Sequence, residues 1–214
     1  MGIAERRARE KEALRRAIID AATELIVKEG YANLSIRKIA DKIEHAPSTI
    51  YLYFRDKLSI LTAICQEVFT ELSAKLEDLA RTEPDPALGI KRGLTCYIRF
   101  GLSHPQHYIV TFLTPYPPEA ETVVEQGEFG SVGIQCFDNL RRAVRRGIDA
   151  GVVRPGDVNL VSQSLWTAIH GLTSILITMG NEKSFPWAPH DELIEYHVDM
   201  LWRGIALDSA HGSS

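Results

Sequence analysis

The chain has 214 residues, of which 45% are hydrophobic and 24% charged, a composition typical of a folded globular protein and unlike that of a disordered one. Its net charge of −4 hides a division, because residues 1–60 carry 12 basic and 9 acidic side chains, whereas residues 61–214 carry 12 basic and 19 acidic ones. This division favours a basic binding module joined to an acidic body. The three cysteines form no CxxC pair, which excludes a zinc ribbon and a dithiol redox motif, so we expect reduced thiols in or near a core.

Apolar residues recur at helical spacing along most of the chain, and no run alternates between apolar and polar residues as a β-strand would. Glycine and proline mark the ends of the segments, as at Gly30 and in the Glu83–Pro86 stretch. A break is expected near Gly127, Gly130 and Gly133. We predict an all-α protein with helices at residues 6–28, 35–42, 46–53, 56–81, 87–103, 105–113, 119–150, 158–180 and 190–207.

The helices at 35–42 and 46–53 are separated by about three residues, which is the spacing of a helix-turn-helix. On the second helix, Ser48, Thr49 and Tyr51 form a face of mostly small polar groups that can lie close in a DNA major groove. Basic residues around it suit phosphate contacts. The N-terminal cluster of arginines and lysines, which is interleaved with glutamates, fits either a solvated helix face or a basic arm that helps to hold DNA.

The segment IADKIEHAPSTIYLYFRDKLSIL resembles the signature of the tetracycline-repressor (TetR-like) family of bacterial regulators, and the resemblance extends over about residues 12–75. It implies a three-helix DNA-binding domain at residues 1–57, a connecting helix at 56–81, a helical effector-binding and dimerisation domain at 58–208, and a disordered tail at 209–214. The signature positions that match are Ile39, Ala40, Thr49, Tyr51, Tyr53, Phe54 and Lys57. The DNA contacts that it implies are Arg37, His45, Pro47, Ser48, Thr49, Tyr51 and Lys57, although core packing is the alternative for Tyr51 and the expectation for Tyr53.

The turn of the motif departs from the family pattern. Glu44, His45 and Ala46 stand where Gly-Val-Ser is usual, and Ser48 stands where glycine is common. Glu44 therefore has to adopt the turn without the freedom of glycine at positive φ, and Ala46 cannot cap the second helix as serine does. These differences leave the fold unchanged and make the operator sequence unpredictable.

The segment 158–181 has no formal charge and is long enough to span a bilayer, but Asn, Ser, Gln, Thr and His side chains occur throughout it. We expect a helix covered by protein, and no membrane partner. Together with the last helix it suggests a four-helix interface with a second copy, as the last two helices form in TetR-like dimers. The residues expected there are Leu165, Leu172, Leu176, Ile194, Val198, Leu201 and Ile205. Such a dimer suits a palindromic operator.

Trp166, His170 and Gly171 resemble the Trp…His-Gly element of one group of TetR-like C-terminal domains. Trp166 and His170 share a helix face, and aromatic residues are frequent between residues 96 and 137. We predict a pocket for a small, largely apolar effector, with ordinary core packing as the alternative. The residues expected to line it are Tyr97, Phe100, Tyr108, Phe112, Phe137, Trp166 and His170.

The sequence therefore predicts a cytoplasmic, ligand-responsive TetR-like regulator, a repressor with double-stranded DNA, a second copy and a small-molecule effector as partners. A ligand-independent or architectural DNA-binding regulator is the alternative. We expect no enzyme and no cofactor, because P-loop, nucleophile-elbow and His-Glu-x-x-His motifs do not occur. His104 and His107 have a chelating spacing, but no acidic or cysteine residue stands near them in the sequence, so no metal site is expected. The absence of an apolar core in residues 1–16 argues against a signal peptide.

Overall fold

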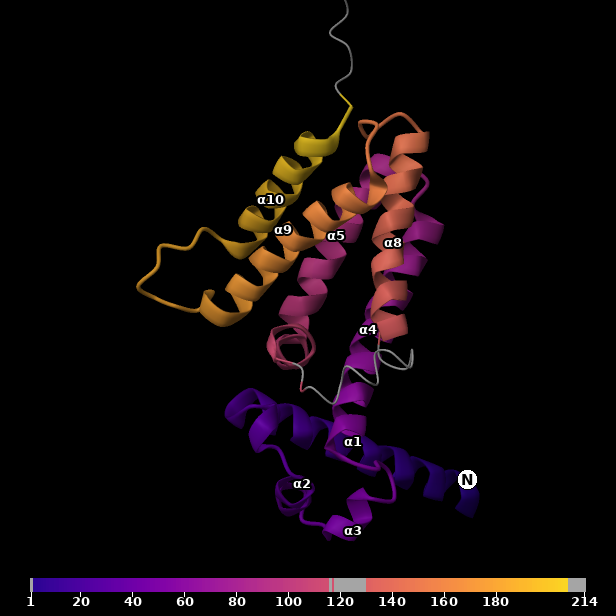
Figure 1. The fold of residues 1–214 in the computed structure, drawn as a ribbon, viewed down its shortest axis with the longest axis vertical. Helices are drawn as coiled ribbons and strands as arrows, with labels where there is room; N and C mark the ends of the chain where they lie inside the picture. The colour runs from indigo at the N-terminus through magenta and orange to yellow at the C-terminus, as the bar shows by residue number, and fades with distance from the viewer. Residues whose placement is uncertain (1, 116, 118–129, 208–214) are drawn as a thin grey trace, which may run out of the picture. The chain divides into compact units, whose positions relative to one another are not determined.

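The computed structural model describes residues 2–115, 117 and 130–207, which are almost entirely helical (Figure 1). Within these residues the β-pairing is limited to an isolated bridge between Val153 and Ala206, which confirms the all-α prediction. The elements are α1 (Ile3–Glu29), η1 (Tyr31–Asn33), α2 (Ile36–Lys42), α3 (Pro47–Ile50), α4 (Lys57–Thr82), α5 (Pro86–Ser103), α6 (Pro105–Tyr108), η2 (Ile109–Leu113), α8 (Gly130–Asp149), α9 (Val158–Met179) and α10 (His190–Ile205).

The chain divides into two compact units. One contains Met1–Val68 and Gln106–Val132, and the other contains Phe69–Pro105 and Gly133–Ser214. The boundary therefore falls inside α4, after Val68, whereas the domains predicted from the sequence meet between residues 57 and 58.

Several predicted helices are shorter in the structure. The helix expected at 46–53 ends at Ile50 and continues as a turn. The helix expected at 105–113 is the single turn α6 followed by η2, a π-helix, for which the apolar spacing gave no signal. The helix expected at 119–150 is described only from Gly130 onward, and the predicted break near Gly127 and the tail at 209–214 lie outside the described residues.

The first unit is organised by local signals that the sequence contains. Gly30 ends α1 with φ 80°, and its N–H donates to the Ile26 carbonyl at 2.8 Å. Ser35 caps α2, since its hydroxyl accepts the Lys38 N–H at 3.2 Å. The core beneath these helices is aliphatic and includes the fully buried side chains of Ile18, Ile19, Ile39, Ile50, Ile60 and Ile64.

The second unit is built on α5, which packs against α9 and α10 (Figure 1). Asp85 begins α5 by accepting the Ala87 and Leu88 N–H groups at 2.8 and 3.2 Å, and Pro86 occupies the first turn. The three cysteines are free thiols, as expected. Burial raises the pKa of the Cys136 thiol to about 11, so this group is protonated and unreactive at neutral pH.

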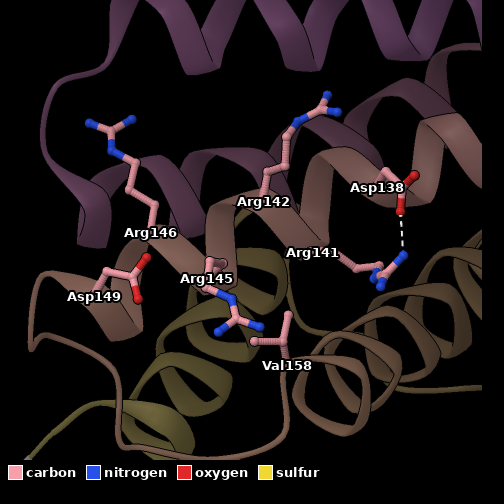
Figure 2. Close-up of a pocket in the computed structure, with 7 residues that line it drawn as sticks. All are labelled: Asp138, Arg141, Arg142, Arg145, Arg146, Asp149 and Val158. Carbon is pink, nitrogen blue, oxygen red and sulfur yellow. Dashed lines mark hydrogen bonds and ion pairs between the residues drawn. The ribbon is translucent and has the colours of Figure 1, made fainter.

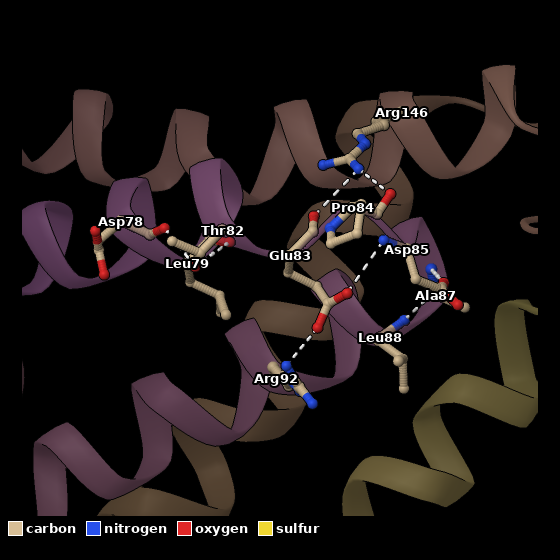
Figure 3. A network of polar contacts seen from close by, with 10 residues as sticks. All are labelled: Asp78, Leu79, Thr82, Glu83, Pro84, Asp85, Ala87, Leu88, Arg92 and Arg146. Carbon is tan, nitrogen blue, oxygen red and sulfur yellow. Dashed lines mark hydrogen bonds and ion pairs between the residues drawn. The ribbon is translucent and has the colours of Figure 1, made fainter.

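A polar network fixes the junction between α4 and α5 (Figure 3). The Glu83 side chain is buried, and its carboxylate accepts from Arg92 and, at 3.1 Å, from the Asp85 N–H. Arg146 of α8 donates to the carbonyls of Glu83 and Pro84 just beyond the end of α4. This network ties α8 to the same junction.

Gly147 allows α8 to approach its neighbours closely. A Cβ at this position would lie 2.7 Å from Val153 Cγ2 and 3.0 Å from Ile90 Cδ1, whereas a Cβ at Gly89 would meet nothing nearer than 3.9 Å. We therefore expect Gly147→Ala to lower the free energy of unfolding by roughly 1–3 kcal/mol through overpacking. Gly89→Ala is the control, and it should be neutral or stabilising because alanine favours a helix. Urea denaturation of both variants measures the difference in the free energy of unfolding. Equal values for the two variants would show that Val153 and Ile90 move aside for the added methyl group without cost.

Candidate functional site

The helix-turn-helix presents its second helix to solvent. Ile50 is fully buried and anchors α3 to the core of the first unit. On the opposite face His45, Pro47, Ser48 and Tyr51 are exposed, Tyr51 with 59% of its surface accessible, and Thr49 is half-buried. Arg37 of α2 is exposed as well. Tyr51 is thus not a core residue, and the positions expected to contact DNA are available for contact.

The unusual turn holds its shape by hydrogen bonds. Glu44 adopts φ 58°, a positive value as its place in the turn predicts. The N–H of His45 donates to the Ala40 carbonyl at 3.0 Å, and the ring Nδ1 of His45 lies 2.6 Å from the Ile43 oxygen. A non-glycine residue in this region costs about 1–2 kcal/mol. The surrounding contacts therefore hold the turn that presents α3.

Lys57 has a neighbour that the sequence did not indicate. Its ammonium lies 4.6 Å from the centroid of the Tyr31 ring, a cation–π contact that positions the side chain at the start of α4. Two other lysines of the motif are engaged in ion pairs, Lys38 with Glu29 and Lys42 with Glu24, both at 2.7 Å. The Lys38 hydrogen bond lowers the pKa of Glu29. These two lysines stabilise the first unit.

Part of the N-terminal basic cluster is also paired with acidic side chains. Arg15 and Arg16 each reach Glu67 of α4 at 2.8 Å, and Arg6 pairs with Glu10 one turn away at 3.1 Å. Arg15 and Arg16 thus link α1 to α4, and both the solvated helix face and the basic arm stay predictions for the rest of the cluster.

Four of the seven predicted effector residues form one cluster in the second unit. The hydroxyl of Tyr97 on α5 lies 3.2 Å from Nδ1 of His170 on α9. The rings of Trp166 and His170 are 5.5 Å apart, and Phe137 of α8 meets the edge of Trp166 at 6.1 Å. Burial lowers the pKa of His170, so the imidazole is neutral at pH 7. The cluster combines apolar rings with one hydrogen-bonding pair.

The other three predicted effector residues lie elsewhere. Phe100 packs against His104 on its own helix at 4.8 Å. Tyr108 and Phe112 belong to the first unit, where their rings contact each other at 4.7 Å and Tyr108 is fully buried. The sequence grouped these residues because they are aromatic and close along the chain, whereas Phe100 belongs to the same unit as the cluster around Trp166, and Tyr108 and Phe112 belong to the other unit. In the part of the chain that the structure describes, no group of three or more His, Cys, Asp or Glu side chains could hold a metal ion.

The stripe expected at the dimer interface faces largely inward. Leu165, Leu176, Ile194 and Val198 are each at most 3% exposed within the single chain, on helices that pack against α5. They are therefore unavailable to a partner in this conformation, and Leu172, Leu201 and Ile205 are half-buried. The apolar residues that α9 and α10 do expose are Leu160, Ile175, Met179, Tyr196 and Met200.

A pocket rich in arginine lies on α8 and was not predicted from the sequence (Figure 2). Arg141, Arg142, Arg145 and Arg146 line it, together with two aspartates and Val158 at the start of α9. The signal that could have indicated it is the run RRAVRR at residues 141–146, which places four guanidinium groups within two helical turns.

Comparison with known proteins gives one consistent result. The family model "Bacterial regulatory proteins, tetR family" matches residues 18–64, and "Tetracyclin repressor-like, C-terminal domain" matches residues 90–201. The fatty acid metabolism regulator protein of Bacillus subtilis is 29% identical over 155 residues, 71% of this chain and 77% of that protein. The transcriptional activator FasR of Mycolicibacterium smegmatis is 23% identical over 198 residues, 92% of this chain and 84% of that protein.

Solved structures share the fold. The fatty acid degradation regulator FadR of Bacillus halodurans superposes with a TM-score of 0.76 at 21% identity, over 89% of this chain and 95% of that one. FadR of Bacillus subtilis in complex with stearoyl-CoA superposes with a TM-score of 0.74 at 23% identity, over 89% of this chain and 98% of that one.

Proposed function

The chain belongs to the TetR family of bacterial transcription regulators, and from this premise we propose that it is a cytoplasmic repressor, released from its operator by a fatty acyl effector. The observation that carries the proposal is the pairing of an exposed α3 with the Tyr97–Phe137–Trp166–His170 cluster in a separate unit of the same chain. The first can read DNA, and the second can take an apolar ligand. A constitutive regulator without a ligand is the alternative, and it would require no response to any acyl compound.

For the DNA contacts we assign Tyr51 and Lys57 to phosphates and Arg37 to a phosphate or a base edge. Ser48, Thr49 and His45 then lie nearest the bases, and Pro47 sets the first turn of α3. The support is exposure: except for Thr49 and Lys57, which are half-buried, all of these side chains are exposed. Phosphate contacts hold the protein in register, and contacts with base edges supply sequence specificity.

Loss of the Lys57 ammonium should weaken binding to all duplexes alike. We expect Lys57→Ala to make the slope of log affinity against log salt shallower by about one unit, since one phosphate contact is lost. Fluorescence anisotropy titrations at several salt concentrations measure this slope. Lys183→Ala, which removes an exposed lysine from the loop before α10, is the control. An unchanged slope would remove Lys57 from the interface.

We propose that two copies pair through the outward faces of α9 and α10. Among the described residues, α9 alone is long and apolar enough to cross a membrane, yet only 28% of its most apolar 18-residue stretch is buried in the single chain. Leu160, Thr167, Gly171 and Ile175 lie along one side of this helix, and that side carries no charge. An apolar helix face of this kind is stabilised when it is buried against another apolar surface. In a two-fold dimer the same face of the second copy provides that surface.

For the effector, the relatives supply the chemical class. Two of them are named for fatty acid metabolism or degradation, and FadR of Bacillus subtilis was crystallised with stearoyl-CoA. In this chain the aromatic rings suit an acyl chain, and the Tyr97–His170 pair suits a polar group at its end. We propose that ligand binding acts through α4, whose residues belong to both units. The coupling expected between two such sites is about 1–3 kcal/mol.

Selection from a pool of randomised duplexes tests the DNA-binding half of the proposal. The full chain should enrich an inverted repeat whose half-sites are about 34–36 Å apart, or a multiple of that, because a two-fold dimer presents two copies of α3. A selection that enriches no sequence, or a single unrepeated site, would contradict a dimer on a palindromic operator.

A further inference from the structure

Leu52, in the turn that follows α3, is the most exposed large hydrophobic residue in the part of the chain that the structure describes, with 79% of its surface accessible. Single exposed apolar residues are common on protein surfaces, so exposure alone assigns no role. The position of Leu52 is more informative. The exposed apolar residues of α9 and α10 lie where a second copy is proposed to cover them, whereas Leu52 belongs to the helix-turn-helix, the part of the chain that binds DNA.

The backbone keeps a helical path from α3 through Leu52. The N–H of Leu52 donates to the Thr49 carbonyl at 3.2 Å. Two residues later, the N–H of Phe54 donates to the Ile50 carbonyl at 3.0 Å. Residues four apart on such a path lie on one face, so Leu52 shares the face of Ser48, and the fully buried Ile50 lies on the opposite side. The face that carries Ser48 is therefore one turn longer than α3 itself, and its far end is apolar.

An apolar side chain on this face has one chemical match among the base edges of B-DNA. In the major groove the bases present hydrogen-bond donors and acceptors, and the exception is the C5-methyl group of thymine. A leucine placed against a donor or an acceptor would displace water without replacing its hydrogen bonds, which costs free energy. A leucine placed against the methyl group removes apolar surface of both partners from water, which is favourable.

We propose that Leu52 selects a thymine in each half-site of the operator by contact with the C5-methyl group of that base. This rests on the proposed entry of α3 into the major groove, and it adds a residue that determines sequence specificity. Ser48 is small and lets the helix lie close to the bases, and Leu52 fills the space one turn further along. One position of the half-site is thus recognised by apolar contact instead of hydrogen bonding.

Deoxyuridine in place of thymidine tests the contact, because it removes the methyl group and leaves base pairing unchanged. Each thymine of the selected operator is replaced in turn, in both half-sites at once, and the affinity of the full chain is measured by fluorescence anisotropy. We expect one position at which the parent protein binds about 15-fold more weakly, since each buried methyl group contributes about fourfold and the dimer makes the contact twice.

Leu52→Ala completes a double-mutant cycle with the uracil duplex. Because Leu52 is exposed, the variant should fold normally. It should bind the thymine duplex more weakly than the parent does, and it should no longer distinguish thymine from uracil at the sensitive position. Leu88→Ala is the matched control, since it shortens another exposed leucine, on α5 in the other unit, and it should respond to uracil as the parent does.

The outcomes separate the role of Leu52 from the proposed function. Equal affinities of the parent for all thymine and uracil duplexes, or a preferred half-site without thymine, would overturn the role of Leu52 and leave the DNA-binding function standing. A uracil effect that persists in full in Leu52→Ala would also overturn it, because another residue would then contact the methyl group. If the parent protein prefers no duplex, both proposals are overturned.

Discussion

Replacement of Ile175 by glutamate should convert the protein to a monomer and reduce its affinity for operator DNA by at least about 100-fold. Ile175 is 46% exposed on the uncharged side of α9. In a two-fold interface each substitution acts twice, so two carboxylates would be buried against an apolar surface. A monomer has one helix-turn-helix. It therefore loses the increase in affinity, of about 10²- to 10⁴-fold, that a dimer gains by binding one duplex with two of them.

Sedimentation velocity and anisotropy titration of the same samples measure the two effects. Ile134→Glu is a matched control, because Ile134 is 62% exposed on α8 and the substitution introduces the same charge outside α9 and α10. It should leave a dimer with normal affinity. A dimeric Ile175→Glu protein, or a parent protein that sediments as a monomer, would contradict the proposed interface.

A glutamate in place of Ser48 should reduce binding to every duplex by at least about 100-fold, because it sets a negative charge against the phosphates and occupies the closest point of approach. Ser48 lies in the first turn of α3, and its side chain is exposed. The substitution therefore disturbs no buried contact, so the fold and the dimer should remain.

Anisotropy titration at low salt measures the loss, and sedimentation verifies that the variant is still a dimer. Thr70→Glu adds the same charge at an exposed position of α4 and should bind DNA as the parent does. If Ser48→Glu binds within a few-fold of the parent, α3 is not the helix that enters the groove.

Much of the fold could be predicted because its signals are local. Gly30, Ser35 and Asp85 begin or end helices by contacts within a few residues, and the apolar spacing of α2 and α3 marks Ile39 and Ile50 as core residues. Even the positive φ of Glu44 follows from its place in the motif. Such features depend on residues within a few positions along the chain, so they can be inferred directly from the sequence.

The candidate site was harder to predict because it depends on which helix faces pack against each other in the folded chain. Periodicity marked Leu165 and Ile194 as a stripe, but it could not tell a core from an interface, since α9 is apolar on both its inner and its outer side. Tyr97 and His170 are brought together by the packing of α5 on α9, which no local pattern encodes. The contact of Arg146 with the end of α4 likewise joins residues 63 positions apart.

The most direct test of the account is the affinity of the selected operator duplex with and without saturating stearoyl-CoA, measured by anisotropy on the dimeric parent protein. Coupling between the two sites predicts that the ligand weakens operator binding by about 5- to 150-fold, and that operator DNA weakens ligand binding by the same factor. Equal affinities in the presence and absence of bound ligand would contradict a ligand-responsive repressor.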